Sequence, residues 1–314
     1  MSPSPTSSSS ASSPPTTTST SSPAATYLSH PRFNRTHTFP ASPTHPELQI
    51  SYADVGRQPS PSTSSDDIPT VLFIPGMFAT RFSAVWLHHI AERSGARVIV
   101  VDRYILSLFE WLLFILLEEF GDMWICIWNQ IPRLVVTQAI PTLALSGAVF
   151  NTTSSVITSG AFSGSNPDET KAVEVNRRKI EAGYGLSRDF QAKIDTELPR
   201  RIFSESTVGA NREALLCLKK GPRGLWGVCD DYEDFIKRLV EGERAKTSKV
   251  KVRVFFAAED SMIGVKGREY MDCCWKEQDD LDFESRIIAN TDHDSVLQSI
   301  EVLESVFREV ASRS

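Results

Sequence analysis

Two apolar stretches, TVLFI at residues 70–74 and RVIVVD at residues 97–102, decide the fold of this 314-residue chain. Both are rich in β-branched residues, and such apolar runs are typical of strands covered on both faces. Between them, residues 82–94 carry apolar side chains at helical spacing, and Gly95 stops the helix. Strand, helix and strand in succession predict a parallel crossover unit and therefore an α/β sheet.

Further elements are expected on either side of this unit. Polar and apolar residues alternate over residues 47–55, which predicts a half-buried strand, and residues 250–257 and 283–289 predict two more strands. Helical spacing recurs between them, at residues 167–183, 189–198, 232–244 and 267–276. The chain ends in an amphipathic helix whose inner face carries Val296, Leu297, Ile300, Leu303 and Phe307.

The composition limits the kinds of binding partner and the cellular compartment that we expect. Acidic residues outnumber basic ones by 39 to 33, which favours a small or neutral substrate over nucleic acid. The five cysteines lack CxxC spacing and lie apart from the histidines, so we expect neither a zinc site nor a cofactor. Residues 1–30 are rich in Ser, Thr and Pro and predict a disordered tail. With no signal or transit pattern there, we expect a cytoplasmic protein.

Residues 104–117 break the α/β pattern. They are apolar nearly all round, interrupted only by Ser107 and Glu110. A membrane-spanning helix needs about 20 apolar residues, so this run favours a buried helix. A membrane-associated protein anchored by residues 104–117 remains an alternative.

Two polar residues follow the last two expected strands. Asp260 comes after residues 250–257 and His293 after residues 283–289, and open α/β sheets place their sites beyond the carboxyl ends of strands. A carboxylate can fix the tautomer of a histidine that acts as a general base. The other five histidines lie at or before residue 89, so His293 is the candidate base.

A structural origin also fits each residue alone, because Asp260 can cap the next helix and His293 lies in a candidate N-cap between Asp292 and Asp294. The order, acid before histidine on successive loops, favours the catalytic interpretation. If it holds, the two side chains lie within about 2.6 to 3.2 Å of each other.

These features resemble the α/β-hydrolase superfamily of the serine hydrolase type. VLFIPGMF at residues 71–78 is similar to the strand and oxyanion loop of that family, with Pro75 where many members have histidine. AAED at residues 257–260 and Asp292-His293 are similar to its acid and histidine loops. The likeness covers about residues 47–103 and 250–312.

The resemblance implies a parallel α/β-hydrolase-like sheet whose core comes in two parts, residues 31–123 and 249–314. Residues 124–248 would then form a helical cap. The backbone N–H of Met77, or of Phe78, would donate to the developing oxyanion. The implied activity is hydrolysis of a small apolar or ester-like acyl substrate.

The nucleophile of that family is missing from the sequence. No serine has glycine both two residues before it and two residues after it, and in GAFSG at residues 160–164 the first glycine is one residue too far from Ser163. Residues 104–123 occupy the place of the elbow strand and its helices. We therefore expect a fold that is incomplete in the centre, an unknown nucleophile and no acyl transfer by the chain as written. The interpretation is an internally shortened hydrolase; a non-catalytic relative that binds a ligand or partner is the rival.

Overall fold

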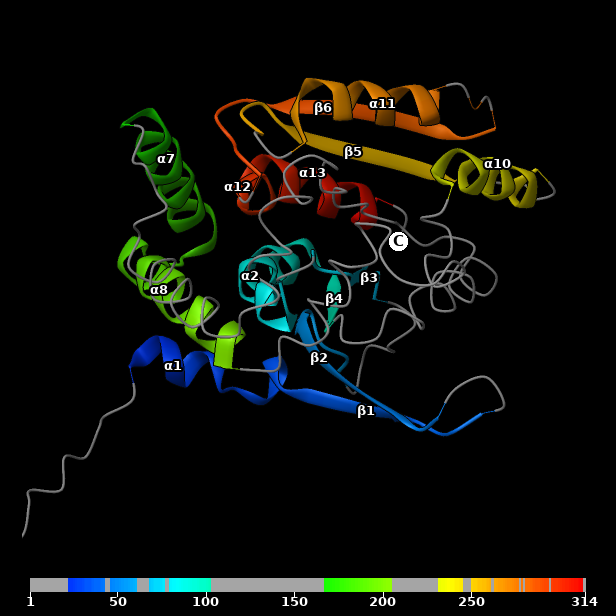
Figure 1. Ribbon diagram of the computed structural model, residues 1–314. Helices are drawn as coiled ribbons and strands as arrows, with labels where there is room; N and C mark the ends of the chain where they lie inside the picture. Colours follow the sequence, from blue (N-terminus) through cyan, green and yellow to red (C-terminus); the bar gives the residue numbers. More distant parts are fainter. Residues whose placement is uncertain are drawn as a thin grey trace, which may run out of the picture.

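The computed structural model shows an α/β protein with two separate sheets (Figure 1). It describes residues 22–42, 46–60, 68–76, 79–102, 167–204, 231–244, 250–260, 263–276, 278, 280–293 and 295–312. The expected α/β class is thereby confirmed.

The first sheet has four strands in the order β1-β2-β4-β3. They are β1 (Arg35–Phe39), β2 (Leu48–Gly56), β3 (Thr70–Phe73) and β4 (Arg97–Val101). Strands β3 and β4 are parallel and are joined by the helix α2 (Ala84–Ser94), which confirms the predicted crossover.

The first two strands extend the parallel pair of β3 and β4 in the antiparallel sense. β1 pairs with β2 and β2 with β4 in antiparallel fashion. A connection as short as that from β1 to β2 permits only an antiparallel pair, because a parallel pair needs a crossover of a dozen residues or more. The sequence analysis missed β1 because its residues, RTHTF, are mostly polar and exposed and show no core-facing alternation.

The second sheet consists of two parallel strands, β5 (Lys251–Ala257) and β6 (Asp282–Ile288), joined by α11 (Gly264–Lys276). Val252, Val254 and Phe256 of β5 pack against α11 and α10 (Tyr232–Glu243). Within the described ranges no strand connects this sheet to the first.

The C-terminal helices fill the space between the two sheets (Figure 1). They are α12 (Ser295–Gln298) and α13 (Ile300–Ala311), separated by Ser299 in an extended conformation. Asn176 binds both ends of this break, donating to the carbonyl of Gln298 at 2.8 Å and accepting from the amide of Ile300 at 3.0 Å. The predicted inner face is confirmed, since its residues are buried or, at Leu297, partly buried.

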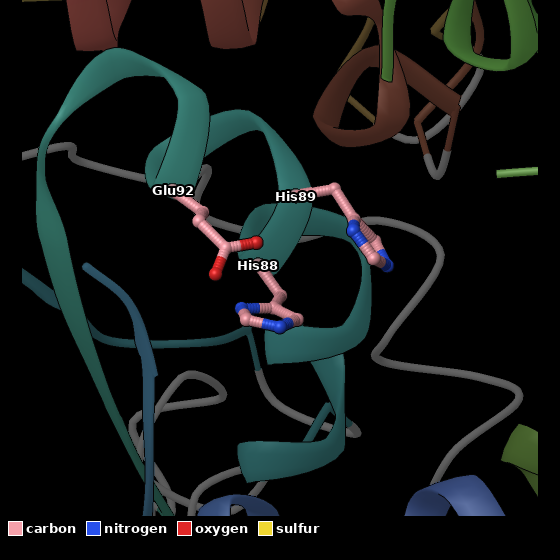
Figure 2. A group of neighbouring side chains, drawn as sticks. All are labelled: His88, His89 and Glu92. Atoms are coloured by element: carbon pink, nitrogen blue, oxygen red, sulfur yellow. The ribbon is translucent and has the colours of Figure 1, made fainter. Parts of the chain in front are cut away.

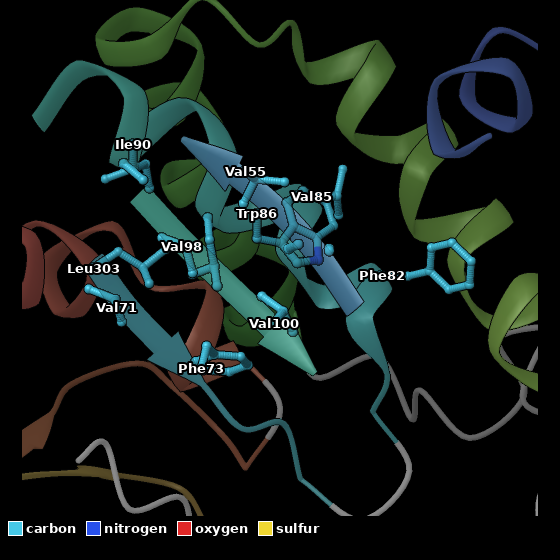
Figure 3. Close-up of a cluster of buried hydrophobic side chains, with 14 of the residues drawn as sticks. Val55, Val71, Phe73, Phe82, Val85, Trp86, Ile90, Val98, Val100 and Leu303 are labelled. Atoms are coloured by element: carbon cyan, nitrogen blue, oxygen red, sulfur yellow. The ribbon is translucent and has the colours of Figure 1, made fainter. Parts of the chain in front are cut away.

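The helices α7 (Pro167–Tyr184) and α8 (Arg188–Ser204) belong to the main core. Ile180, Leu186 and Ile194 lie in the same buried cluster as the apolar side chains of β3, β4 and α2, part of which Figure 3 shows. Full burial of such a side chain stabilises the fold by about 1.5–3 kcal/mol. In the described part of residues 124–248, then, α7, α8 and α10 pack as core helices, and a cap remains a prediction for the rest of that range.

The expected tail at residues 1–30 folds at its end. α1 (Pro23–Leu28) begins at the N-cap Ser22, whose hydroxyl accepts from the amide of Ala25, and Pro occupies the first helical position. A 3-10 turn, η1 (Pro31–Phe33), follows. Leu28 and Phe33 are fully buried. Burial of these two side chains orders a segment whose polar composition predicted disorder. Residues 1–21 lie outside the described ranges.

The apolar run at residues 104–117 also lies outside the described ranges. Among the residues that are described, no helix has the length and apolar character needed to cross a bilayer.

Candidate functional site

Asp260 and His293 meet at the carboxyl ends of β5 and β6. The Nδ1 atom of His293 lies 3.0 Å from Oδ2 of Asp260, which confirms the predicted distance. Parallel neighbouring strands end at the same edge of a sheet, so residues that are 33 apart in the chain are brought together by two short loops. The topology alone therefore explains the contact.

The acid loop is fixed to the histidine loop through its backbone. The amide of Ala258 donates to the carbonyl of Ile288 at 3.1 Å, and the amide of Glu259 donates to that of Thr291 at 3.0 Å. The second oxygen of Asp260 accepts from the amide of Ile263 at 2.9 Å. Both oxygens of this carboxylate thus have fixed directions.

A reciprocal turn holds the backbone of His293. Asp292 accepts from the amide of Ser295 at 2.7 Å and from its hydroxyl at 2.6 Å, while the Ser295 hydroxyl accepts from the amide of Asp292 at 2.8 Å. This closes an N-cap on α12. The N-cap interpretation of the sequence is therefore also right, but it applies to Asp292 and leaves the His293 side chain free to pair with Asp260.

The geometry of the pair suits a general base. The side chain of Asp260 is 3% exposed and that of His293 is 19% exposed. A carboxylate that accepts at Nδ1 would hold the proton of a neutral imidazole there and leave the lone pair on Nε2. In the described part of the chain no hydroxyl or thiol is hydrogen-bonded to Nε2. Within that part, Asp260 orients the His293 ring and no candidate nucleophile is bound to it.

The predicted oxyanion donors, Met77 and Phe78, lie outside the described residues, as does Ser163. Arg81, which follows shortly after the two donors in the chain, is held by a buried aspartate. Asp102, directly after β4, accepts from the amide of Arg81 at 2.6 Å and from its guanidinium at 2.5 Å. An aspartate at the end of a buried strand is visible in the sequence, but the identity of its partner is not.

A second cluster of titratable side chains lies on α2 and includes two of the five histidines that lie at or before residue 89. His88, His89 and Glu92 bring possible ligand atoms within 4.8 Å of one another (Figure 2). The donor set does not suit a metal ion. Nδ1 of His88 accepts from the amide of Gly56 at 3.0 Å, and its Nε2 contacts the guanidinium of Arg32. A metal at Nε2 would require an imidazolate, with a cation already beside it.

The electrostatics of this cluster keep His88 neutral. Burial, with the neighbouring Arg32, His89 and His30, lowers the pKa of His88 to about 3. Burial also lowers the pKa of His89, against the opposing charge of Glu92. The two histidines of this cluster are therefore poor general bases at neutral pH.

No protein-family model and no curated protein matches this sequence. Several solved structures are similar to it. A bromoperoxidase from Bacillus anthracis is 12% identical, with a TM-score of 0.44 over 85% of this chain and 96% of that one. A carboxylesterase of Nitrososphaera gargenis is 13% identical, with a TM-score of 0.43 over 88% and 99%. The epoxide hydrolase VrEH1 from Vigna radiata is 10% identical, with a TM-score of 0.43 over 89% and 97%.

These proteins have the α/β-hydrolase fold, the same fold that residues 71–78, 257–260 and 292–293 resemble in sequence. TM-scores below 0.5 carry no argument about activity. What the site does must follow from its own geometry.

Proposed function

We propose that this chain derives from hydrolases of small ester-like or other acyl substrates and retains the acid and base of their catalytic triad. Asp260 orients the imidazole, and His293 is the base. The observation that carries the proposal is the 3.0 Å bond between the two side chains, formed by loops that follow adjacent parallel strands. The Met77 or Phe78 amide is the proposed oxyanion donor.

The chemistry of the pair suits proton transfer to and from a reacting hydroxyl. Nε2 of His293 would take the proton as the hydroxyl attacks the acyl carbon, and Asp260 would stabilise the imidazolium that forms. The proton would then pass to the leaving group. Each of these roles needs a nucleophile within hydrogen-bond reach of Nε2.

The chain as written lacks the sequence in which that nucleophile normally stands. Gly160 and Gly164 are the one pair of glycines four residues apart, and the residue between them at the serine position is Phe162. Loss of the nucleophile removes nearly all of the covalent rate advantage. We therefore propose a chain of hydrolase lineage that performs no acyl transfer, shortened internally by splicing or by an error in the gene model.

The same observation supports a second candidate function. A hydrolase-like chain without a nucleophile can still bind a small apolar ligand or a partner protein. In that case the Asp260–His293 pair serves as a polar contact for the ligand.

A fluorophosphonate probe tests the loss of acyl transfer that both candidate functions imply, because it labels only an activated nucleophile. We expect no labelling of the full chain and no p-nitrophenyl ester hydrolysis above that of His293→Gln. The matched control is His37→Gln, because His37 is exposed on β1. Labelling or hydrolysis that His293→Gln abolishes and His37→Gln preserves would refute the loss of activity.

The native transcript tests the shortened chain separately. We expect a message with additional coding sequence between codons 103 and 124. A message that reads continuously through these codons would show that the chain is not shortened.

A further inference from the structure

We propose that the N-terminal segment, residues 22–34, docks on α2 through an acid-sensitive histidine cluster and opens locally as the pH falls below neutral. The cluster consists of His88 and His89 of α2, together with Tyr27, His30 and Arg32 of the segment. This inference does not depend on the proposed function.

The segment covers α2 with apolar and polar contacts. Leu28 and Phe33 are fully buried, and the ring of Phe33 meets that of His88 edge-on at 6.5 Å. The Tyr27 hydroxyl lies 3.2 Å from Nε2 of His89, and the two rings are stacked. Arg32 contacts Nε2 of His88. Both histidines of α2 therefore face the segment.

His88 can occupy this position only in its neutral form. Its Nδ1 accepts a hydrogen bond from the Gly56 amide of β2, so that nitrogen must be unprotonated. Protonation would place a second donor against that amide and a second cation beside Arg32. The ring is 4% exposed, so water cannot take over either role.

Two basic side chains, His30 and Arg32, and one acid, Glu92, lie near His88 and His89. His30 accepts from the backbone and side chain of Arg32 through Nδ1, at 3.2 and 3.1 Å, and so also needs an unprotonated nitrogen. Glu92 is the acid near the two α2 histidines (Figure 2). Its charge opposes the lowering of the pKa of His89, whereas burial, Arg32, His89 and His30 all act to lower the pKa of His88.

Two arginines from elsewhere hold the ends of the segment at every pH. Arg81 donates to the carbonyl of Phe33 at 3.0 Å, and Arg201 donates to the carbonyl of Ala25 at 2.9 Å. Neither guanidinium titrates in the physiological range. Acid should therefore favour a local opening of residues 22–34 rather than their complete detachment.

Proton linkage gives the direction and size of the effect. Burial lowers the pKa of docked His88 to about 3 from an ordinary value of 6.5, so the opened form binds more protons between these values. Docking is complete above pH 6.5 and weakens as the pH falls below it. If opening restores the ordinary value, the opening constant rises by up to about 30-fold between pH 8 and pH 5.

Amide hydrogen exchange of the full chain, corrected for intrinsic exchange rates, measures this opening. We expect the amides of His30 and Phe33, both hydrogen-bonded within the segment, to lose protection at pH 5. Amides of β4 should keep theirs. Equal loss in both regions would mean global unfolding and would overturn the proposal, as would protection of the segment that is independent of pH.

Substitution assigns the effect to its group. His88→Gln keeps an acceptor for the Gly56 amide but does not titrate, so the pH dependence should shrink to a few-fold. The control, His37→Gln, removes an exposed histidine and should keep the full dependence. An unchanged pH dependence in His88→Gln contradicts the assignment. If that variant does not fold, His89→Gln must reduce the dependence for the proposal to stand.

Discussion

Two aspartates occupy equivalent positions in the two halves of this protein and have different partners. Asp102 follows β4 and binds the guanidinium of Arg81, whereas Asp260 follows β5 and binds the imidazole of His293. Both carboxylates are buried. The guanidinium is a permanent cation, which makes the first pair a structural clamp. The second partner is an imidazole, a type of side chain that can act as a general base, and this is the role that we propose for the pair.

A similar contrast separates the two environments of histidine. His293 faces a carboxylate and is partly exposed. His88 faces Arg32 and is buried, so a proton on its ring is disfavoured. For each histidine, the partner and the exposure of the ring, more than the residue type, decide whether the ring suits a general base or a packing element.

The largest expected effect comes from breaking the Asp102 clamp. Asp102→Ala leaves the charge of Arg81 buried and should lower the free energy of unfolding by about 3–5 kcal/mol. Urea titration of the full chain measures this. The control is Asp280→Ala, which breaks an exposed pair with Arg244 and should change the free energy of unfolding far less, because solvent screens the pair. Equal losses in the two variants would contradict the distinction between clamp and surface pair.

The next effect is the acid dependence that His88 imposes on global stability. Its pKa is lowered to about 3 in the folded chain, chiefly by burial, so stability is fully present above pH 6.5 and falls below it. We expect this residue to account for a loss of about 2 kcal/mol between pH 8 and pH 5. The loss should be absent from His88→Gln when urea midpoints are compared. A wild-type loss that this variant retains in full would assign the effect to other groups.

Asp260→Asn tests the Asp260–His293 pair and should change the free energy of unfolding less than Asp102→Ala. The asparagine oxygen can still accept from the Ile263 amide, so we expect a cost of about 1.5 kcal/mol. Its side-chain NH₂ then faces Nδ1 of His293, which must become the acceptor. Nitrogen-15 NMR should show the neutral tautomer change from Nδ1–H to Nε2–H. An unchanged tautomer would mean that Asp260 does not orient the ring.

Much of the fold could be predicted from the sequence because its strands are local apolar runs. Those at residues 70–74 and 97–102 needed no knowledge of their partners. β1 could not be predicted in this way, because a polar strand is specified by pairing with β2. The fold of residues 22–33 also depended on a distant surface, since the pocket for Phe33 is formed in part by α2.

The candidate site and its surroundings could likewise be predicted only in part. The Asp260–His293 pair was predictable because the order of strands and loops brings successive strand ends together. Two other pairings, Arg81 with Asp102 and Arg32 with His88, could not be predicted. The sequence around an arginine does not indicate which distant side chain it will contact. The role of Asp292 as the N-cap was also hidden by its neighbours, since Asp294 is an equally good candidate by type.

The smallest expected effect concerns that N-cap and tests whether the His293 loop is held by it. Ser295→Ala removes the hydroxyl that donates to Asp292 and accepts from its amide, while the Ser295 amide can still donate. Caps of this kind contribute about 0.5–2 kcal/mol, and because one bond survives we expect a loss near 0.5 kcal/mol.

The loss of stability alone would be expected for any helix cap. The informative measurement is the Nδ1 proton of His293, which resonates far downfield when it is bonded to a carboxylate and is seen only when exchange with water is slow. We expect this resonance to weaken in Ser295→Ala and to return in Ser295→Thr, which restores the hydroxyl. If the resonance persists unchanged in Ser295→Ala, the backbone bond between Glu259 and Thr291 is sufficient to hold the Asp260–His293 pair. In that case the loop of Asp260, and not the N-cap of α12, determines that this aspartate binds an imidazole while Asp102 binds a guanidinium.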